Sequence, residues 1–573
     1  PPPLAAPLPL GQEPATPPPP PIRRTAGGLR VARTSFGNLS VSDERRMVRV
    51  RQVEVLPDHR LVVTGVLTDL EAAELTVGLT SPTTSSWAQA ESTGDSGFVA
   101  TIAQEHDLWG HGRTPPPTGG YALVTRARST EERTGTDETR PTTPVTVLIE
   151  QTVAEQLSVV TDTAKAQVRI RQLSRRRLQV RLSPPLTDVE RGGRQQQRLQ
   201  TELRQRLTRP RSESRSVLFR SNFGEIAGCN QLAVHRELVR RGGGFRLYWA
   251  VKDHSVQVPD GGIPVVHESE EWYRLLHEAE FYLDNMHQPI YHRKPAHQVQ
   301  VQTFHGYPFK QMGRRNWVRQ QREAAHVESY LERAEDWDFM VSPARYATQP
   351  LCEAFGFSNE VLEIGYPRND ALLHPCAPQV SSDARKRLGI HPDQTAILYA
   401  PTFREELSKD DFKAAMVDFL DLNRVVSALG PAHVLLVRGH AFNARRSERV
   451  RAGEQVIDAT DYPDVTELML ASDAAILDYS SLRFDYGLTG KPMIFLVPDL
   501  ERYVSSSRGS IMPYQPTAPG PLLRTTDEVI SSLRGLSEVD QDWAAARATF
   551  REEFLDLEDG HATERLVDRV FFS

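Results

Sequence analysis

The chain has 573 residues, 39% of them hydrophobic and 25% charged, and its formal net charge is -6. This length predicts about three or four domains, and the mild negative charge argues against a nucleic-acid partner. Three scattered cysteines are too few for a disulfide framework or a zinc site and fit a reducing compartment. Neither an apolar run of about 18 residues nor a signal-peptide pattern occurs, so we expect no membrane-spanning helix and no secretion signal in these residues.

The first 40 residues are rich in proline, as in PPPLAAPLPL and PATPPPPPIRR. Proline fixes φ and lacks a backbone N–H, so such a segment favours neither helix nor sheet. Residues 1–40 are therefore predicted to be a disordered, Pro-rich linker, more an inert spacer than a recognition motif.

Residues 41–187 alternate apolar and polar side chains, a pattern typical of half-buried strands. Pro, Gly, Asp and Thr clusters separate the segments VRVRQVEVL, RLVVTGVLT, AELTVGL, FVATIA, YALVTRA, TPVTVLI, AQVRIRQL and LQVRLSPPL. The pattern predicts an all-β, sandwich-like domain. It contains no catalytic constellation, so packing, spacing or contact with a polymer is the expected role.

Residues 188–211 are charged and rich in glutamine, which predicts a helical linker. Beyond them, strand and helix patterns alternate in two series, over 212–378 and 379–573. The fold class is therefore α/β, with two Rossmann-like lobes that place ligands at the carboxyl ends of strands.

A histidine follows a predicted strand of the first lobe. The strand QVQVQ leads to Phe304, and His305 and Gly306 follow on a predicted tight turn. Histidine is suited to proton transfer near neutral pH. A lone histidine of this kind is more often structural, so the second lobe has to supply further evidence.

The second lobe has two such strand ends. HVLLV is followed by Arg438 and His440, which offer a guanidinium for phosphate and a second imidazole. The run from Ala474 to Leu477 is followed by Ser480 and Ser481 at a predicted helix start, where N–H groups and hydroxyls favour an anion. A nucleoside diphosphate fits such a turn, and an ordinary capped helix is equally compatible.

Asp336 and Asp338 have a spacing that many metal-dependent glycosyltransferases use. They follow a helix of arginine and glutamate rather than a clear strand end, so we predict no metal site there. Four histidines also lack the pattern of a zinc motif: His277, His287, His292 and His297.

Six ordered motifs connect these residues: FHGYPFK, GYPRND, YAPTFR, RGH, SDAAILDYSSLRFDY and GKPMIF. Together they resemble the CDP-glycerol glycerophosphotransferases, the teichoic acid polymerase family, from roughly Ser216 to the C-terminus. The resemblance implies a GT-B type pair of lobes. It also implies transfer of glycerol phosphate from CDP-glycerol to a hydroxyl of a membrane-anchored, teichoic-acid-type polymer, with release of CMP.

The resemblance suggests roles for the strand-end residues. His305 is the expected base for the attacking hydroxyl, while His440 and Arg438 would stabilise the charge on the departing CMP. Ser480 and Ser481 are expected to bind the diphosphate. Three further candidates are Lys310 and Arg404 as phosphate contacts and Asp485, which would orient a donor hydroxyl or the helix. No metal and no other cofactor is expected.

The chain departs from the family pattern after His305-Gly306, where the family usually has Thr-Pro-Leu-Lys. Tyr307 and Phe309 stand at the Thr and Leu positions and are expected to reshape the acceptor side of the cleft. Gln231 replaces a proline that is usual after Cys-Asn.

A lipid-linked polymer acceptor requires contact with a membrane. Residues 312–332 combine basic side chains with an aromatic one: Arg314, Arg315, Arg319, Arg322 and Trp317. Such a segment suits anionic lipid, although glutamates dilute its charge and a solvated helix is the alternative. We expect a peripheral protein at the cytoplasmic face of the membrane, and a homo-oligomer stays open.

Two alternatives remain. A CDP-ribitol-dependent enzyme, or a transferase that adds a single primer unit, would share these motifs, because they do not reveal the polyol contacts. A catalytically dead protein that binds wall polymer is a different class. The presence of both His305 and His440 counts against it.

Overall fold

The computed structural model describes most of the chain after Met47, together with three strands before it. The described residues are 23–24, 29–33, 39–43, 46–82, 84–107, 109–128, 142–150, 153, 160–174, 177–206, 214–402, 419–439, 455–506 and 510–573. The early strands form an antiparallel sheet: β1 (Arg23–Arg24), β2 (Leu29–Arg33) and β3 (Leu39–Asp43). These strands lie within or at the end of the segment predicted as a linker, and LRVAR and LSVSD alternate apolar and polar residues, so they can pair. The other residues of 1–40 lie outside the described part.

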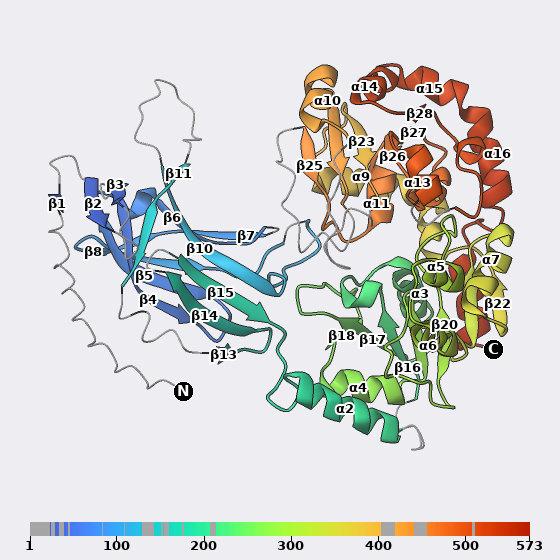
Figure 1. The fold of residues 1–573 in the computed structure, drawn as a ribbon, viewed down its shortest axis with the longest axis horizontal. Helices are drawn as coiled ribbons and strands as arrows, with labels where there is room; N and C mark the ends of the chain where they lie inside the picture. Colours follow the sequence, from blue (N-terminus) through green and yellow to red (C-terminus); the bar gives the residue numbers. More distant parts are fainter. Residues whose placement is uncertain are drawn as a thin grey trace, which may run out of the picture.

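Two larger sheets make up the rest of the strand-rich N-terminal region (Figure 1). One has the order β13-β14-β15-β10-β6-β7 with β11 beside β10, and the other has the order β12-β4-β5-β9-β8. The strands are β4 (Met47–Val55), β5 (Leu61–Thr68), β6 (Leu75–Thr80), β7 (Ser85–Gln89), β8 (Glu91–Gly94), β9 (Gly97–Ile102), β10 (Gly119–Arg128), β11 (Thr142–Pro144), β12 (Thr146–Ile149), β13 (Val160–Asp162), β14 (Gln167–Ser174) and β15 (Arg177–Ser183). Inward residues of both sheets, among them Val63, Phe98, Val168 and Val180, form one hydrophobic cluster. The sequence analysis missed β7 and β8 because their polar residues show no apolar period.

The first lobe is a parallel sheet with the order β18-β17-β16-β19-β20-β21-β22. Its strands are β16 (Ser216–Arg220), β17 (Arg246–Val251), β18 (Gly262–Val266), β19 (Phe281–Asp284), β20 (Val299–Gln302), β21 (Phe339–Ser342) and β22 (Glu360–Glu363). The helices between them are α3 (Cys229–Arg241), α4 (Glu270–Glu278), α5 (Gly313–Arg319), α6 (Ala324–Ala334) and α7 (Arg345–Phe355). The strand order reverses between β16 and β19, the position at which such sheets bind ligands.

The second lobe repeats this design with the order β25-β24-β23-β26-β27-β28, again all parallel. Its strands are β23 (Thr395–Tyr399), β24 (His433–Val437), β25 (Val456–Asp458), β26 (Ala474–Leu477), β27 (Met493–Leu496) and β28 (Leu522–Leu523). Its helices are α9 (Ala377–Arg387), α10 (Leu422–Leu429), α11 (Val465–Ala471), α12 (Leu482–Gly487), α13 (Leu500–Ser506), α14 (Thr526–Arg534), α15 (Leu536–Asp542) and α16 (Ala544–Phe554). The short α8 (Asp370–Leu373) lies in the connection between the lobes. Strands such as AAIL are entirely apolar because helices cover both faces of a parallel sheet.

Two helices complete the first lobe from outside its predicted range. Helix α2 (Gly193–Arg206), predicted as a linker, places Leu199 and Leu203 in one hydrophobic cluster with Trp272 of α4. The C-terminal helix α17 (Ala562–Phe571) packs on α3, and the ring centroids of Phe571 and Phe281 lie 4.5 Å apart. By its contacts α17 belongs to the first lobe, although it follows the second lobe in sequence.

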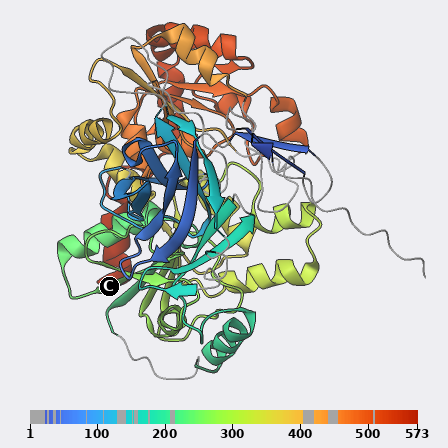
Figure 2. The same ribbon diagram turned by 90° about the vertical axis from the view of Figure 1, so that its left-hand side faces the viewer.

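The loop between β9 and β10 joins the N-terminal region to both lobes, and Figure 2 shows that region in front of them. Trp109 Nε1 donates to Asp461 Oδ1 of the second lobe at 3.1 Å. The N–H and hydroxyl of Thr118 donate to Asp253 Oδ2 of the first lobe at 2.9 and 2.7 Å. Asp253 follows β17 and Asp461 follows β25, so the N-terminal region is fixed at the carboxyl-end edge of both parallel sheets.

We expect the buried ion pair at the end of β16 and β19 to be a major source of stability in the first lobe. Arg220 Nη1 lies 2.8 Å from Asp284 Oδ2, and the two side chains are 5% and 1% exposed. Asp284→Ala leaves a buried guanidinium without its carboxylate and should cost about 3–5 kcal/mol in the free energy of unfolding. Urea unfolding followed by the fluorescence of the buried tryptophans measures this cost.

The matched control is Glu360→Ala, which breaks a half-exposed pair with Arg569. Such a pair is worth at most about 1 kcal/mol. Equal losses in the two variants would contradict the importance of the buried pair.

Candidate active site between the two lobes

His305 lies just beyond β20, at the carboxyl edge of the first lobe. Its Nδ1 is 2.9 Å from the backbone carbonyl oxygen of Asn285, which follows β19. A carbonyl oxygen can only accept a hydrogen bond, so Nδ1 carries the proton and the lone pair resides on Nε2. The side chain is exposed. This tautomer suits a proton acceptor.

The backbone before His305 has an unusual conformation. Phe304 has a φ of 51°, in the left-handed region that disfavours a bulky residue. Asn230 of α3 donates from Nδ2 to the carbonyl oxygen of Phe304 at 3.1 Å. Gln231 donates to the hydroxyl of Thr303 at 3.0 Å. These bonds stabilise the strained turn that presents His305.

The lobes meet directly beside His305. A Cβ atom added to Gly306 would lie 2.7 Å from Ser481 Oγ, so a larger residue would collide with the second lobe. Tyr366, between the lobes, donates from its hydroxyl to the carbonyl oxygen of Gly306 at 3.0 Å. The structure therefore brings His305 and the predicted serine pair together.

The sequence analysis did not select Arg368, yet this residue connects all parts of the site. It lies in the 3-10 turn η3 (Pro367–Asn369) between the lobes. Its guanidinium donates to Asp485 Oδ1 at 3.0 and 2.7 Å and to the carbonyl oxygen of His305 at 2.8 Å. Burial alone would lower the pKa of Arg368, but the Asp485 carboxylate raises it well above its ordinary value. The motif GYPRND contains Arg368, but no strand-end pattern singled it out.

Asp485 is consequently a buried partner of this arginine. Its side chain is 3% exposed and belongs to α12, on the second lobe. Through Arg368 it acts on the backbone of His305. The sequence could not reveal this link, because Asp485 and Arg368 are 117 residues apart in the chain.

The serine pair lies between β26 and α12. Helix α12 has only six residues, so its dipole is small. The N–H and hydroxyl groups of the turn itself are therefore the main donors available to an anion. Ser480 Oγ accepts from the N–H of Leu482 at 3.2 Å, and Ser481 makes no side-chain cap bond. The carboxylate of Asp478, two residues before Ser480, accepts the N–H of Thr402 at 2.9 Å and so joins the ends of β26 and β23.

Arg438 follows β24 and is bonded to a neighbouring loop. Its Nη1 donates to the carbonyl oxygen of Ala459 at 2.9 Å and to that of Tyr462. Burial lowers the pKa of Arg438, and the nearby carboxylate of Asp461 opposes this effect. The same loop receives Trp109 of the N-terminal region. Arg438 is thus positioned by the loop that the N-terminal region contacts.

The remaining predicted residues are less closely tied to His305. Lys310 forms a β-bridge with Ser510, and its Nζ lies 5.4 Å from the ring centroid of Tyr503. It therefore lies against the second lobe. Arg404 and His440 lie outside the described residues.

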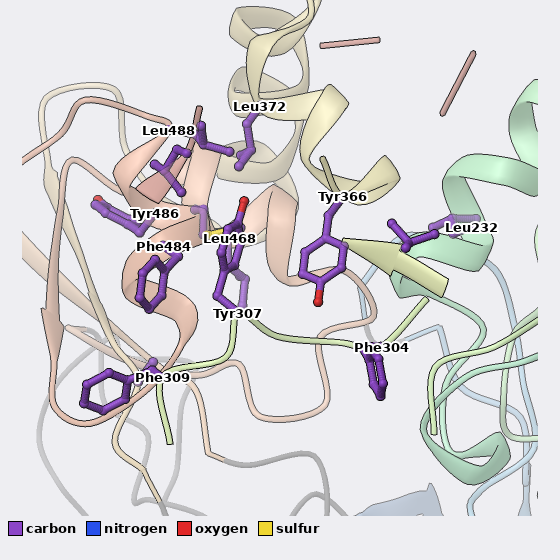
Figure 3. Packing of buried hydrophobic residues seen from close by; sticks show 14 of the residues in the cluster. Leu232, Phe304, Tyr307, Phe309, Tyr366, Leu372, Leu468, Phe484, Tyr486 and Leu488 are labelled. Atoms are coloured by element: carbon purple, nitrogen blue, oxygen red, sulfur yellow. The ribbon is translucent and has the colours of Figure 1, made fainter. Parts of the chain in front are cut away.

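Tyr307 and Phe309 are each 2% exposed, so they lie inside the protein rather than on an open surface of the cleft. Figure 3 shows Tyr307 beside Phe484 and Phe309 further along the same loop. The rings of Tyr307 and Phe484 stack with centroids 4.9 Å apart. Both side chains fill the contact between the lobes, a direction that the sequence alone does not reveal.

Glu558 gathers three donors on one carboxylate oxygen. Its Oε1 accepts the hydroxyl of Tyr307, the N–H of Tyr366 at 3.0 Å and Asn369 Nδ2 at 2.9 Å. In the described part of the chain, Oε2 has no hydrogen-bond partner. Burial raises the pKa of Glu558 to about 7. This residue therefore titrates near neutral pH while it links the first lobe to the C-terminal segment.

Asp336 and Asp338 take part in ion pairs. Asp338 Oδ1 lies 2.7 Å from Lys294 Nζ, and Asp336 Oδ2 lies 3.1 Å from Arg293 Nε. The two carboxylates thereby hold the segment before β21 to the segment before β20. Over the described ranges, no group of three or more His, Cys, Asp or Glu residues is arranged to bind a metal ion.

The basic segment 312–332 contains α5 and most of α6. Its arginines are exposed, and Val318 is 62% exposed. Trp317 stacks on Tyr330 with ring centroids 4.5 Å apart, so the tryptophan packs within the segment. No helix among the described residues is long and apolar enough to cross a bilayer.

Comparisons with known proteins agree with this arrangement. The family model for CDP-Glycerol:Poly(glycerophosphate) glycerophosphotransferase matches residues 203–572. The teichoic acid poly(glycerol phosphate) polymerase of Bacillus subtilis (strain 168) is 31% identical over 370 residues, 62% of this chain and 48% of that protein. The teichoic acid ribitol-phosphate primase of Bacillus spizizenii (strain ATCC 23059 / NRRL B-14472 / W23) is 28% identical over 239 residues, 41% of this chain and 59% of that protein. The solved wall teichoic acid polymerase TagF has a TM-score of 0.61 and 27% identity, and covers 66% of this chain and 93% of its own.

Two parallel-sheet lobes with a site at facing strand ends define a transferase-type fold of the GT-B class, and the likeness to TagF supports it. The strand-rich region precedes this pair of lobes. The chain belongs to the CDP-glycerol:poly(glycerophosphate) glycerophosphotransferase family. It spans about half the length of its Bacillus subtilis relative.

The raised pKa of Glu558 predicts a pH-dependent stability. The unfolded chain loses this proton near pH 4.5, whereas the folded chain keeps it to about pH 7, so ionisation of the unfolded state comes first. The free energy of unfolding should therefore fall as the pH rises between these values and level off above them. The loss should be on the order of 3 kcal/mol relative to Glu558→Gln, which cannot ionise.

Thermal unfolding at pH values from 4.5 to 8 measures this difference. Glu553→Gln on the exposed side of α16 is the matched control and should follow the wild type. If the stability of the wild type and that of the Glu558→Gln variant changed with pH in parallel, the raised pKa of Glu558 would be contradicted.

Proposed function

We propose that this protein is an enzyme that transfers glycerol phosphate from CDP-glycerol to a hydroxyl of a membrane-anchored, teichoic-acid-type polymer and releases CMP. One observation carries the proposal: Gly306 lies against Ser481, which brings a proton acceptor next to a turn suited to phosphate. Membership of the family supports the donor and the type of reaction.

In the proposed reaction the acceptor hydroxyl attacks the phosphorus that carries the glycerol, and its proton passes to Nε2 of His305. The new P–O bond forms while the bond between that phosphorus and the CMP oxygen breaks, and CMP leaves with the electron pair. A hydroxyl is not ionised near neutral pH, so a positioned base is worth about a hundredfold to ten-thousandfold in rate. The bond from Nδ1 to the carbonyl of Asn285 supports this role.

Negative charge develops on the departing phosphate. In the proposal, Ser480 and Ser481 donate hydroxyl and N–H groups to the diphosphate, and Arg438 stabilises the charge on CMP. The other phosphate contacts are His440, Lys310 and Arg404. Asp485 acts through Arg368, which makes it a positioning residue.

The acceptor is proposed to be a polymer linked to lipid, reached through a peripheral contact at the cytoplasmic face of the membrane. The exposed arginines and the 62% exposed Val318 of the segment 312–332 support this contact. Because Trp317 packs on Tyr330, electrostatic attraction would contribute more than aromatic insertion.

The division of the chain is part of the same proposal. The shared core of the two N-terminal sheets supports a sandwich-like domain over 41–187, preceded by a linker. The parallel sheets support lobes over 212–378 and 379–573, except that α17 packs on the first lobe. Residues 188–211 form the helical connection, and its helix α2 packs on α4 of the first lobe.

We expect His305→Ala to abolish turnover while donor binding is retained, since the base contributes only to the chemical step. The measurements are CMP release with a lipid-linked acceptor and calorimetric titration with CDP-glycerol. His391→Ala, at an exposed histidine outside the site, is the control and should leave both unchanged.

The same assay decides between donors. Turnover with CDP-ribitol alone would replace glycerol by ribitol in the proposal. Polymer binding by the wild type without CMP release from either donor would indicate a protein that only binds polymer. Normal turnover in the His305→Ala variant would refute the assignment of the base.

Arg368→Lys should lower kcat about a hundredfold, because a displacement of the base by about 1 Å is enough for such a loss. Lysine keeps the charge but cannot reach both Asp485 and the His305 carbonyl with one planar group. The KM for CDP-glycerol should change much less than kcat. Arg345→Lys, at an exposed ion pair with Asp556, is the control, and an equal effect there would contradict the positioning role.

A further inference from the structure

The outer face of the seven-stranded N-terminal sheet is strongly basic. Cross-strand pairing places side chains of β14, β15 and β10 on one face, since Arg169 pairs with Arg181 and Arg181 with Gly120. Alternate residues along each strand then share that face. It carries six exposed arginines: Arg126, Arg128, Arg169, Arg171, Arg177 and Arg181.

These arginines have no acidic partners in the described part of the chain, where no ion pair includes any of them. Arg171 Nε instead donates to Gln179 Oε1 at 2.8 Å. The Arg126 guanidinium lies 4.2 Å from the centroid of the Trp87 ring. The Trp87 ring packs against Gly78 of β6. A Cβ atom added to Gly78 would come within 2.5 Å of this ring. Neighbouring side chains thus hold two of the guanidinium groups on the sheet surface.

The direct pairing of Arg169 with Arg181 is unfavourable in the isolated protein. Residues opposite each other in antiparallel strands have Cβ atoms about 5 Å apart, and like charges there are destabilising. A bound anion between the two guanidinium groups would reverse this effect.

Protection of a sheet edge does not account for the pattern. Charged residues on edge strands prevent aggregation, but β15 and β10 are interior strands of this sheet. The outer face of the other N-terminal sheet has mixed charge, with exposed Glu54 and Glu91. There, Arg51 lies 3.4 Å from Glu150. By strand register the arginine face also includes Asp162, on the edge strand β13, and this carboxylate forms an ion pair with Arg191. The excess of arginine on this face is therefore not a general feature of the two sheets.

The basic face starts at the edge of the first lobe that also carries the candidate active site. Gly120, opposite Arg181, follows Thr118 by two residues, and Thr118 bonds Asp253 at the carboxyl edge of the first lobe. His305 lies at the same edge. From there the arginines continue along the strands, where alternate residues repeat about every 7 Å.

We propose that this arginine face binds a polyanion with regularly spaced phosphodiesters, namely the part of the acceptor polymer that has already been made. The identity of the polymer rests on the proposed function, whereas the preference for a repeating phosphate chain rests on the arginine array itself. A polymer whose end occupies the site would reach the face through its following units. The face would thereby hold long acceptors in place between successive transfers.

The test uses the full chain, with Arg169→Gln/Arg181→Gln as the variant and Arg49→Gln/Arg51→Gln on the opposite outer face as the matched control. The probes are poly(glycerol phosphate) of defined length, glycerol phosphate and vesicles that contain phosphatidylglycerol. We expect the Kd for the polymer to rise at least about tenfold in the variant and to stay unchanged in the control. Wild-type affinity should weaken with salt. The melting temperature of the variant should not fall, because a repulsive pair is removed.

In turnover assays the KM for long acceptors should rise in the variant, while CMP release with a single-unit acceptor stays unchanged. Equal polymer affinity in variant and control would overturn the proposal. So would a loss of binding confined to vesicles, which would indicate a lipid surface as the ligand. Polymer binding needs neither donor nor turnover, so failure of the proposed reaction would be seen separately as wild-type protein that releases no CMP.

Discussion

The candidate site depends on one buried ion pair, that of Asp485 with Arg368. The carboxylate comes from the second lobe, the guanidinium comes from the connection between the lobes, and the arginine also bonds the carbonyl oxygen of His305 in the first lobe. Because a planar guanidinium has several donors in fixed directions, one side chain sets the distance among three segments. The position of the imidazole relative to Ser481 follows from this link. A separation of the lobes at this point would leave a buried charge without a partner, which is costly.

A second connection lies behind the first and explains why the loop after His305-Gly306 carries large residues. Tyr307 stacks on Phe484 and donates its hydroxyl to Glu558, so the aromatic ring and its polar end both contact parts of the chain that follow the first lobe. From there α17 returns to α3 and completes the first lobe. The chain therefore crosses between the lobes twice, and packing at the crossings limits how far they can move apart. The near-neutral pKa of Glu558 makes this packing sensitive to pH.

The strand-rich region is attached at the same edge as the site. Trp109 and Thr118 bond acidic residues that follow β25 and β17, and the loop that receives Trp109 also accepts the hydrogen bonds of Arg438. This attachment gives the N-terminal sheets a fixed direction relative to the lobes. A basic sheet face that leads away from the site is then in a suitable place for the rest of a long anionic acceptor.

The sequence by itself determined the alternating α/β pattern of the two lobes, most strands of the N-terminal region and the strand ends that carry His305, Arg438 and the serine pair. These features depend on the local period of apolar residues and on the turn residues between elements. Both can be recognised in the sequence alone. Only the tertiary structure decided that Asp485 acts through Arg368, that Tyr307 and Phe309 point into the lobe contact, and that α17 belongs to the first lobe. Each of these facts joins residues distant in the chain, and side-chain direction at such contacts is set by packing between elements rather than by local pattern. The polar strands β7 and β8 likewise form because their neighbours supply hydrogen bonds and a core, not because of their own sequence.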